Sequence, residues 1–286
     1  MAGGRDDDHT VYCYDLSQDE WTNLPSLPVR FFGLGQVNGK LVAIGGTIKS
    51  FDKEEKKTDS EKNVRSEVYM YNVEKSQGWE PDTIPPMPTA RHSPGILSLQ
   101  SVLVVAGGYI TSEEFVSSVE IFKPDTSQWC RTDPLPIDCY DVSLTSIGNT
   151  CYMLGGYTEP QNLSEVFYAS ANDLLHNAVL PGEPIHSDTH SAWKTLPNTP
   201  NYRPTAAVLA NHLFDFGGNE TSEGGADKRE VYMYSPSTNS WIYTSDLPAP
   251  LSDVSVNMIS STEIIVIGGK CDGARMKTVY VGTLHL

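Results

Sequence analysis

The chain has 286 residues, enough for two ordinary domains or for one large all-β domain. Its 36 acidic and 20 basic side chains give a formal net charge of −16. This charge argues against nucleic acid and anionic membranes as partners, because phosphate groups are bound by basic surfaces. No run of about 18 apolar residues occurs, so no membrane-spanning helix is expected.

The start of the chain and its cysteines favour a cytoplasmic protein. Residues 1–5 lack the apolar core of a signal peptide. The five cysteines cannot all pair, and their spacing is not that of metal ligands. We therefore expect reduced cysteines and a cytoplasmic location.

A short pattern recurs along the chain in a fixed order. Apolar runs that end in Gly-Gly lie at 42–46, 104–108, 152–156, 214–218 and 266–269, and a stub of the same kind, Gly3-Gly4, precedes them. Each Gly-Gly is followed by a strand of alternating pattern, at 11–14, 68–71, 119–122, 166–168, 231–234 and 279–281. After five of these strands come a tryptophan and a proline-rich corner; the tryptophans are Trp21, Trp79, Trp129, Trp193 and Trp241.

This pattern resembles the Kelch repeat over nearly the whole chain. The resemblance implies an all-β β-propeller with four-stranded antiparallel blades, in which the tryptophans pack between neighbouring blades. We predict one domain, 1–286, with six blades, the N-terminal one incomplete for want of an upstream segment. Five blades with a surplus strand is the alternative. The repeats are placed at about 1–27, 28–86, 87–135, 136–198, 199–248 and 249–286.

Two segments interrupt the regular spacing. The loop at 47–66 carries a charged run at 53–57, and length variation on a repeat scaffold is typical of a functional face. An insertion at 169–192 separates a third strand from Trp193, and residues 172–179 within it are predicted to form a short helix.

The resemblance also implies a binding site. In Kelch-like ubiquitin-ligase adaptors, the residues that open each first strand converge on the central mouth of the top face and hold partner peptides, frequently through arginine. Arg30, Arg91 and Arg203 match that placement, and the residues directly after each Gly-Gly are expected on the same rim. The predicted partner-binding residues are Arg30, Phe31, Arg91, His92, Tyr109, Tyr140, Asp141, Tyr157, Tyr202, Arg203, Asn219, Ser252, Asp253 and Lys270.

Two interpretations of these arginines stay open at this point. Arginine in this part of the repeat also serves a structural role, paired with backbone or acidic groups. Asp141 and Asp253 make the predicted mouth mixed in sign, so an acidic, a basic and a mixed partner are all allowed.

No chemistry-bearing motif competes with binding. His186, Asp188 and His190 have spacing that zinc could use, but they lie in the irregular insertion, and we favour a solvated loop. Hydrolase, phosphate-loop and zinc-protease motifs do not occur, nor do the residues of propeller copper oxidases or of plant iron-binding specifier proteins. We predict no cofactor, no metal and no enzymatic activity.

The predicted function is therefore a protein–protein interaction module for a protein or peptide ligand. Its specific form would be the substrate receptor of a ubiquitin-ligase adaptor. Two alternatives are kept: a propeller enzyme that acts on a carbohydrate or small metabolite, and a structural or actin-associated propeller.

Overall fold

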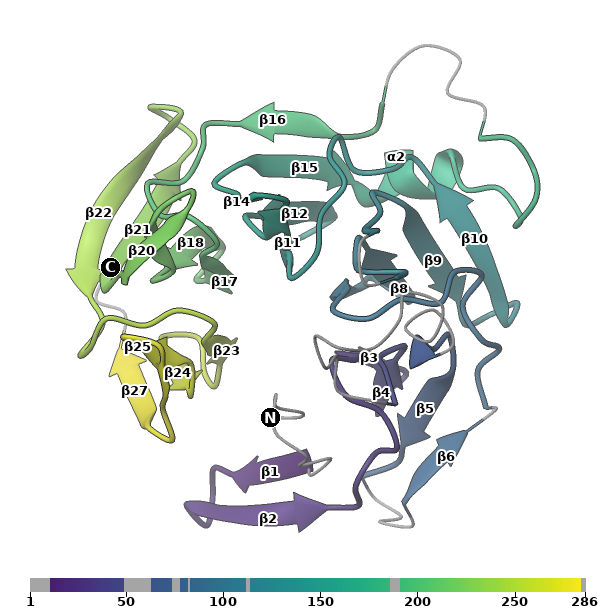
Figure 1. Ribbon diagram of the computed structural model, residues 1–286, viewed down its shortest axis with the longest axis horizontal. Coiled ribbons are helices and arrows are strands. Elements are labelled where there is room, and N and C mark those ends of the chain that lie inside the picture. Colours follow the sequence, from purple (N-terminus) through teal and green to yellow (C-terminus); the bar gives the residue numbers. More distant parts are fainter. Residues whose placement is uncertain are drawn as a thin grey trace. The chain divides into compact units, whose positions relative to one another are not determined.

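The computed structural model describes residues 11–48, 63–73, 78–81, 83–111, 114–185 and 191–283. The chain divides into two compact units, residues 1–141 with 175–189 and residues 142–174 with 190–286. Both units are built from short antiparallel strands, and one helix among the described residues, α2 (Ala171–His176), lies in the insertion (Figure 1).

The first unit holds three sheets, each made of strands that follow one another along the chain (Figure 1). The first sheet has two strands and the other two have four. Their bounds are β1 (Val11–Asp15) and β2 (Glu20–Leu24); β3 (Gly33–Val37), β4 (Lys40–Ile44), β5 (Val68–Tyr71) and β6 (Trp79–Pro81); β7 (Gly95–Leu99), β8 (Val102–Ala106), β9 (Val119–Lys123) and β10 (Gln128–Thr132).

The second unit repeats this plan with two sheets of four strands and one of three. Their bounds are β11 (Ser143–Ile147), β12 (Thr150–Leu154), β15 (Val166–Ser170) and β16 (Lys194–Leu196); β17 (Thr205–Leu209), β18 (His212–Phe216), β21 (Glu230–Ser235) and β22 (Ser240–Asp246); β23 (Ser255–Met258), β24 (Glu263–Ile267) and β27 (Val279–Thr283).

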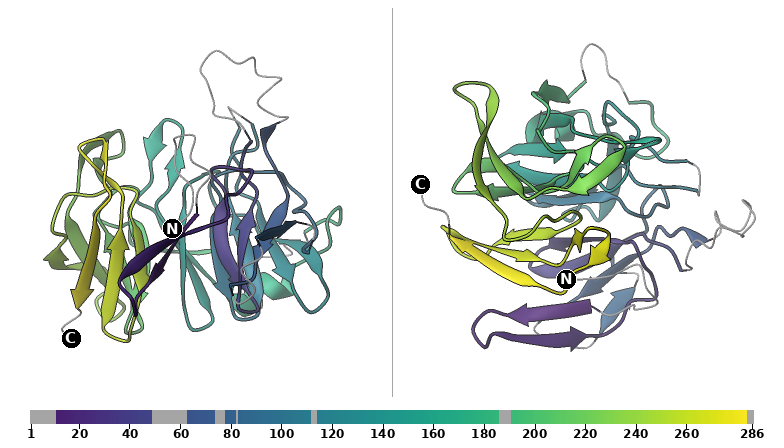
Figure 2. Two further views of the ribbon diagram at one scale, coloured as in Figure 1. Left: turned by 90° about the horizontal axis from the view of Figure 1, so that it is seen from below. Right: turned by 60° about the vertical axis from the view of Figure 1, so that its left-hand side comes forward.

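Small hairpins join the second and third strands of these three sheets. They are β13 (Tyr157–Thr158) with β14 (Gln161–Asn162), β19 (Asn219–Thr221) with β20 (Gly224–Asp227), and β25 (Lys270–Cys271) with β26 (Ala274–Arg275). In Figure 2, left, the green β19–β20 and yellow β25–β26 hairpins extend from the same end of their sheets. The amide of Asn162 donates to the carbonyl of Ser222 at 2.6 Å, which joins two of the hairpins.

The described residues thus form six blades, of which four are complete. Each predicted repeat contains one blade. The prediction of an all-β propeller with an incomplete N-terminal blade is confirmed.

In four blades the tryptophan lies opposite an aromatic residue of the preceding strand: Trp21, Trp79, Trp129 and Trp241. Trp129 lies opposite Phe122 in the register of β9 and β10, with ring centroids 5.3 Å apart. Its indole nitrogen donates to the carbonyl of Pro85, in the proline corner that precedes its own blade, at 2.7 Å. Trp79 and Trp241 make the same bond to the carbonyls of Pro25 and Pro197. The indole therefore binds one blade to the corner that leads into it.

The glycine pairs make the second contact between neighbouring blades. Gly217 has a φ of +58°, and a Cβ built on it would lie 2.2 Å from the carbonyl oxygen of Leu251. That same oxygen accepts a hydrogen bond from the amide of Gly218 at 2.9 Å. Gly107 and Gly108 repeat the arrangement with Cys139. Only glycine allows both the backbone angle and the close approach.

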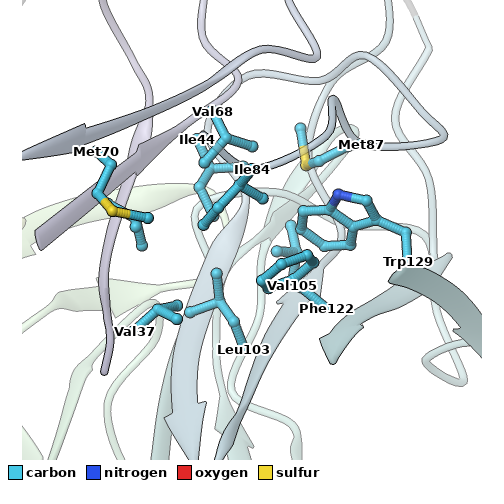
Figure 3. Close-up of a cluster of buried hydrophobic side chains, with 11 residues drawn as sticks. Val37, Ile44, Val68, Met70, Ile84, Met87, Leu103, Val105, Phe122 and Trp129 are labelled. Carbon is cyan, nitrogen blue, oxygen red and sulfur yellow. The ribbon is translucent and has the colours of Figure 1, made fainter. Parts of the chain in front are cut away.

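The core of the first unit lies between the β3–β6 and β7–β10 blades. Figure 3 shows Trp129 and Phe122 packed beside Met87, with Leu103 and Val37 below them. All five side chains are buried. In the second unit, Phe214, Phe216, Leu251 and Val266 belong to an equivalent buried cluster.

The insertion begins as predicted and then departs from the prediction. The hydroxyl of Ser170 accepts a hydrogen bond from the amide of Asp173, which caps the first turn of α2. The helix ends at His176, before the predicted boundary at 179, because Val179 pairs with Arg131 through two backbone hydrogen bonds of 2.8 Å. The run at 53–57, the triplet His186, Asp188 and His190, and the Gly3-Gly4 stub lie outside the described residues.

Candidate functional site

Three residues lead into each first strand, and the structure gives each of the three a separate role. We call them the lead-in: 29–31, 91–93, 139–141, 201–203 and 251–253. The first residue of each lead-in is 0% exposed: Val29, Arg91, Cys139, Asn201 and Leu251.

The second residue of the lead-in forms a backbone bridge in most blades, and the third has a left-handed backbone conformation. In four blades the second residue pairs with the residue that follows the Gly-Gly, as Arg30 with Thr47, His92 with Tyr109, Tyr202 with Asn219 and Ser252 with Lys270. The third has a φ between +49° and +53° in every lead-in: Phe31, Ser93, Asp141, Arg203 and Asp253. In these four blades, the residue that opens the first strand therefore lies beside the residue that follows the Gly-Gly, as predicted.

The three predicted arginines do not occupy equivalent positions. Arg91 is the first residue of its lead-in, Arg30 the second and Arg203 the third. A sequence signal for this existed, because the number of residues from each arginine to the next Gly-Gly differs by one among the three.

Arg91 is a structural residue. Its Nη1 donates to the carbonyls of Gly107 and Ser118 at 2.8 and 2.9 Å, and its Nη2 lies 3.2 Å from Oε1 of Glu120. Both charged side chains are fully buried. The prediction that Arg91 contacts a partner is contradicted by this burial, and its guanidinium instead ties the lead-in to the end of β8 and the start of β9. Arg30 is 7% exposed and is also largely buried.

The first unit carries an aromatic cluster at its lead-ins, which we call the first-unit rim: Phe31, His92, Tyr109, Phe115 and Tyr140. The rings of His92 and Tyr109 stack at 4.9 Å, and the Tyr109 and Tyr140 rings lie 4.1 Å apart. Phe31 approaches His92 at 6.0 Å, and Phe115 approaches Tyr109 at 5.7 Å. Four of these five residues were predicted from sequence, and all except His92 are partly exposed.

Backbone hydrogen bonds hold the lead-ins of the first unit in register. The amide of Ser93 donates to the carbonyl of Phe31 at 2.6 Å, and the amide of Asp141 donates to the carbonyl of Ser93 at 3.0 Å. The side chain of Asp141 is exposed beside Tyr140. The rim is therefore a fixed aromatic surface with a carboxylate at its edge.

His92 is neutral at physiological pH. Burial lowers the pKa of its imidazole to about 4, because the charged form would lose its hydration. A neutral ring stacks on Tyr109 without bringing a charge into the cluster.

Phe115 was missed by sequence reasoning. It lies in the loop between β8 and β9, where length varies from blade to blade, and it pairs with Tyr109 through an isolated bridge. An aromatic residue in a loop of variable length has no counterpart in the repeat that would have drawn attention to it.

The second unit carries polar and charged groups in its lead-ins and directly after two of its Gly-Gly pairs. We call them the second-unit rim: Tyr202, Arg203, Asn219, Ser252, Asp253 and Lys270. One oxygen of Asp253 lies 3.1 Å from Nη2 of Arg203, and the other accepts a hydrogen bond from Nζ of Lys270. The side chains of Arg203, Asp253 and Lys270 are 24%, 28% and 30% exposed, respectively. Asp253 thus neutralises part of the positive charge of its own rim. Tyr157, another predicted binding residue, lies on the β13–β14 hairpin of the same unit.

Other kinds of site receive no support from the described residues. Within them, no group of three or more His, Cys, Asp or Glu side chains has the geometry of a metal site. Among the same residues, no helix is long and apolar enough to cross a membrane. All five cysteines are free thiols, three of them buried.

Comparison with known proteins assigns the repeat. The Kelch motif matches residues 2–28 and 90–136. The chain is 25% identical over 272 residues to the human Kelch repeat and BTB domain-containing protein 12, covering 91% of this chain and 41% of that protein. It is 26% identical over 271 residues to Kelch-like protein 41b of Danio rerio, covering 92% and 40%.

A solved structure shares the fold. The structure of YjhT superposes with a TM-score of 0.71 at 14% identity, covering 96% of this chain and 91% of that one. The chain spans about two fifths of the length of the two curated relatives.

Proposed function

Because the chain is a Kelch-motif β-propeller with distant similarity to Kelch-like proteins, we propose that it is a protein-recognition module that acts by binding rather than by catalysis. The observation that carries the proposal is the first-unit rim. Five aromatic rings from three lead-ins and one loop meet at 4.1 to 6.0 Å, and four are partly exposed. Tyrosine is over-represented in binding hot spots because it offers a large contact area with a polar tip.

The rigidity of this surface supports the same role. Backbone hydrogen bonds fix the lead-ins, and the rings pack on one another, so little side-chain entropy is lost when a partner is bound. Taken by itself, the second-unit rim carries partly exposed charges of both signs, which would favour a partner of complementary charge. The ligand we propose is a protein or peptide segment with an apolar side chain for the aromatic cluster.

The specific form we propose is the substrate-binding part of a ubiquitin-ligase adaptor. Its support is the similarity to a relative named for a BTB domain as well as a Kelch repeat, of which this chain spans 41%. The five free thiols support a reducing, cytoplasmic location.

The test is selection of peptides from a random display library on the immobilised protein. The affinity of a selected peptide is then measured for wild type, Tyr140→Ala and the control Tyr243→Ala, whose ring is 54% exposed on β22. We expect Tyr140→Ala to weaken binding about thirtyfold, which corresponds to about 2 kcal/mol, and the control to leave it unchanged. Failure to enrich any peptide, or equal effects of both variants, would contradict the proposal.

A further inference from the structure

Among the residues that the structure describes, no cation forms an ion pair with one buried carboxyl group of the β17–β22 blade. Asp215 on β18 is 0% exposed, and its Oδ1 accepts a hydrogen bond of 2.8 Å from Nδ2 of Asn201, which is also 0% exposed. The other oxygen of each side chain, Oδ2 of Asp215 and Oδ1 of Asn201, is buried without a hydrogen-bond partner. Two orphaned oxygens in one contacting pair are a costly arrangement if both are acceptors.

The β7–β10 blade shows how this fold treats a buried carboxylate. Asn201 and Arg91 are the first residues of their lead-ins, so they occupy equivalent positions. Arg91 neutralises Glu120, which lies opposite Val105 in the register of β8 and β9. Val105 and Asp215 each stand two residues before a Gly-Gly. Both blades therefore bury a carboxyl group, on β9 in the β7–β10 blade and on β18 in the β17–β22 blade. At the first position of the lead-in, the β7–β10 blade has the guanidinium of Arg91, whereas the β17–β22 blade has the amide of Asn201.

We propose that Asp215 is protonated in the folded protein and that its Oδ2–H donates to Oδ1 of Asn201, so that the two side chains form a neutral acid–amide pair. One proton satisfies both orphaned oxygens and removes the buried charge. The amide nitrogen of Asn201 also donates to the carbonyl of Glu230 at 3.2 Å, which fixes its orientation.

The groups around the pair support a neutral carboxyl group. Tyr232 lies opposite Asp215 on β21, Ala206 lies opposite on β17, and neither supplies a cation. The charge of Glu230 opposes ionisation, and that carboxylate is itself held by Lys228 at 2.9 Å.

Burial is the largest effect on Asp215 and raises its pKa well above the ordinary value. The donors at Asn201 and Thr199 act in the opposite direction but do not offset it. Asn201 directly precedes Tyr202 and Arg203, so the proton lies beneath the second-unit rim. Loss of the proton at alkaline pH would remove the donor to Asn201 and loosen this lead-in.

The test compares wild type with Asp215→Asn, which can form the same pair through its amide. We measure the unfolding equilibrium constant between pH 4 and pH 8. A raised folded-state pKa means that the folded protein holds a proton which the unfolded chain has released above pH 4. The wild-type constant should therefore rise relative to that of Asp215→Asn, by up to about tenfold per pH unit, until the folded pKa is reached. Asp272→Asn, on the exposed turn of β25 and β26, is the matched control and should show no such trend.

Infrared spectroscopy gives a second readout that does not depend on a variant that folds. The carboxyl groups on the surface are ionised at pH 7. The C=O stretching band of a protonated carboxyl group in the folded wild-type protein should therefore be separate from the carboxylate bands. Asp215→Asn should abolish it, and Asp272→Asn should keep it. Absence of the band in wild type, or a stability ratio that does not change with pH, overturns the proposal.

Discussion

The indole nitrogen of Trp129 donates a 2.7 Å hydrogen bond to the carbonyl of Pro85, which lies in the corner that leads into the blade of Trp129. The same side chain is 5% exposed and packs on Phe122. One residue thus serves both the core and the connection between blades.

We expect Trp129→Ala to lower the free energy of unfolding by about 3–5 kcal/mol, because a large buried side chain is replaced by a cavity. Trp129→Phe should keep much of the packing and lose mainly the hydrogen bond, about 1 kcal/mol. Denaturant titration measures both. Trp21→Phe is the comparison, since Trp21 is 39% exposed and should tolerate the change. A loss below about 1 kcal/mol for Trp129→Ala would show that its burial contributes little.

The glycine pairs allow a comparison at similar backbone angles. Gly217→Ala places a methyl group 2.2 Å from the carbonyl oxygen of Leu251, whereas a Cβ on Gly39 has no atom within 4 Å. Both have positive φ, so Gly39→Ala should cost about 1 kcal/mol from backbone strain alone. Gly217→Ala should cost clearly more, because the two blades must also move apart. Equal losses in thermal unfolding would show that the close approach relaxes without cost.

The buried pair of Arg91 and Glu120 should reveal itself in a double-mutant cycle. Arg91→Met leaves a buried carboxylate uncompensated and should cost about 3–5 kcal/mol of stability. Adding Glu120→Gln removes that charge, so the double variant should recover part of the loss. If the double variant is no more stable than Arg91→Met, the pair carries no electrostatic coupling.

His92 predicts a stability change in mildly acidic solution. The unfolded chain has a histidine pKa near 6.5, whereas the folded protein holds it at about 4. The unfolded state therefore binds the extra proton first, and this contribution to stability, complete above about pH 6.5, is lost as the pH falls toward 4. The full loss is about 3 kcal/mol. His92→Phe should flatten this part of the curve of unfolding free energy against pH, and an unchanged curve would contradict the assignment.

The blades were predictable because their signals repeat. Trp129 and Gly107 recur with equivalent neighbours in other blades, so each copy reinforced the others. Arg91 was wrongly predicted to bind a partner. A shift of one residue within a lead-in exchanges a buried side chain for one at the rim, and the three arginines have such similar surroundings in the sequence that the shift was overlooked. The position of Asp215, two residues before a Gly-Gly, belongs to the repeat, but no repeated residue indicates what surrounds its side chain. Its environment is set by Asn201, which only the folded chain brings beside it.

The last prediction concerns the carboxylate that Arg203 and Lys270 share. Asp253→Asn keeps the left-handed backbone angle of +53°, which asparagine tolerates, and removes one negative charge. All three side chains are 24–30% exposed, so solvent screens their attraction and the stability should change by less than about 1 kcal/mol.

Binding should respond more strongly than stability, because two cations lose the carboxylate that they share. We expect a labelled tetraglutamate peptide to bind Asp253→Asn about tenfold more tightly than wild type at low salt. The gain should shrink as salt rises, because the rim is exposed to screening ions. Arg203→Gln in the same background should reverse the gain, since the planar guanidinium matches a carboxylate better than an amide does. Equal affinity of wild type and Asp253→Asn, measured by fluorescence anisotropy, would show that these cations are not available to an acidic partner.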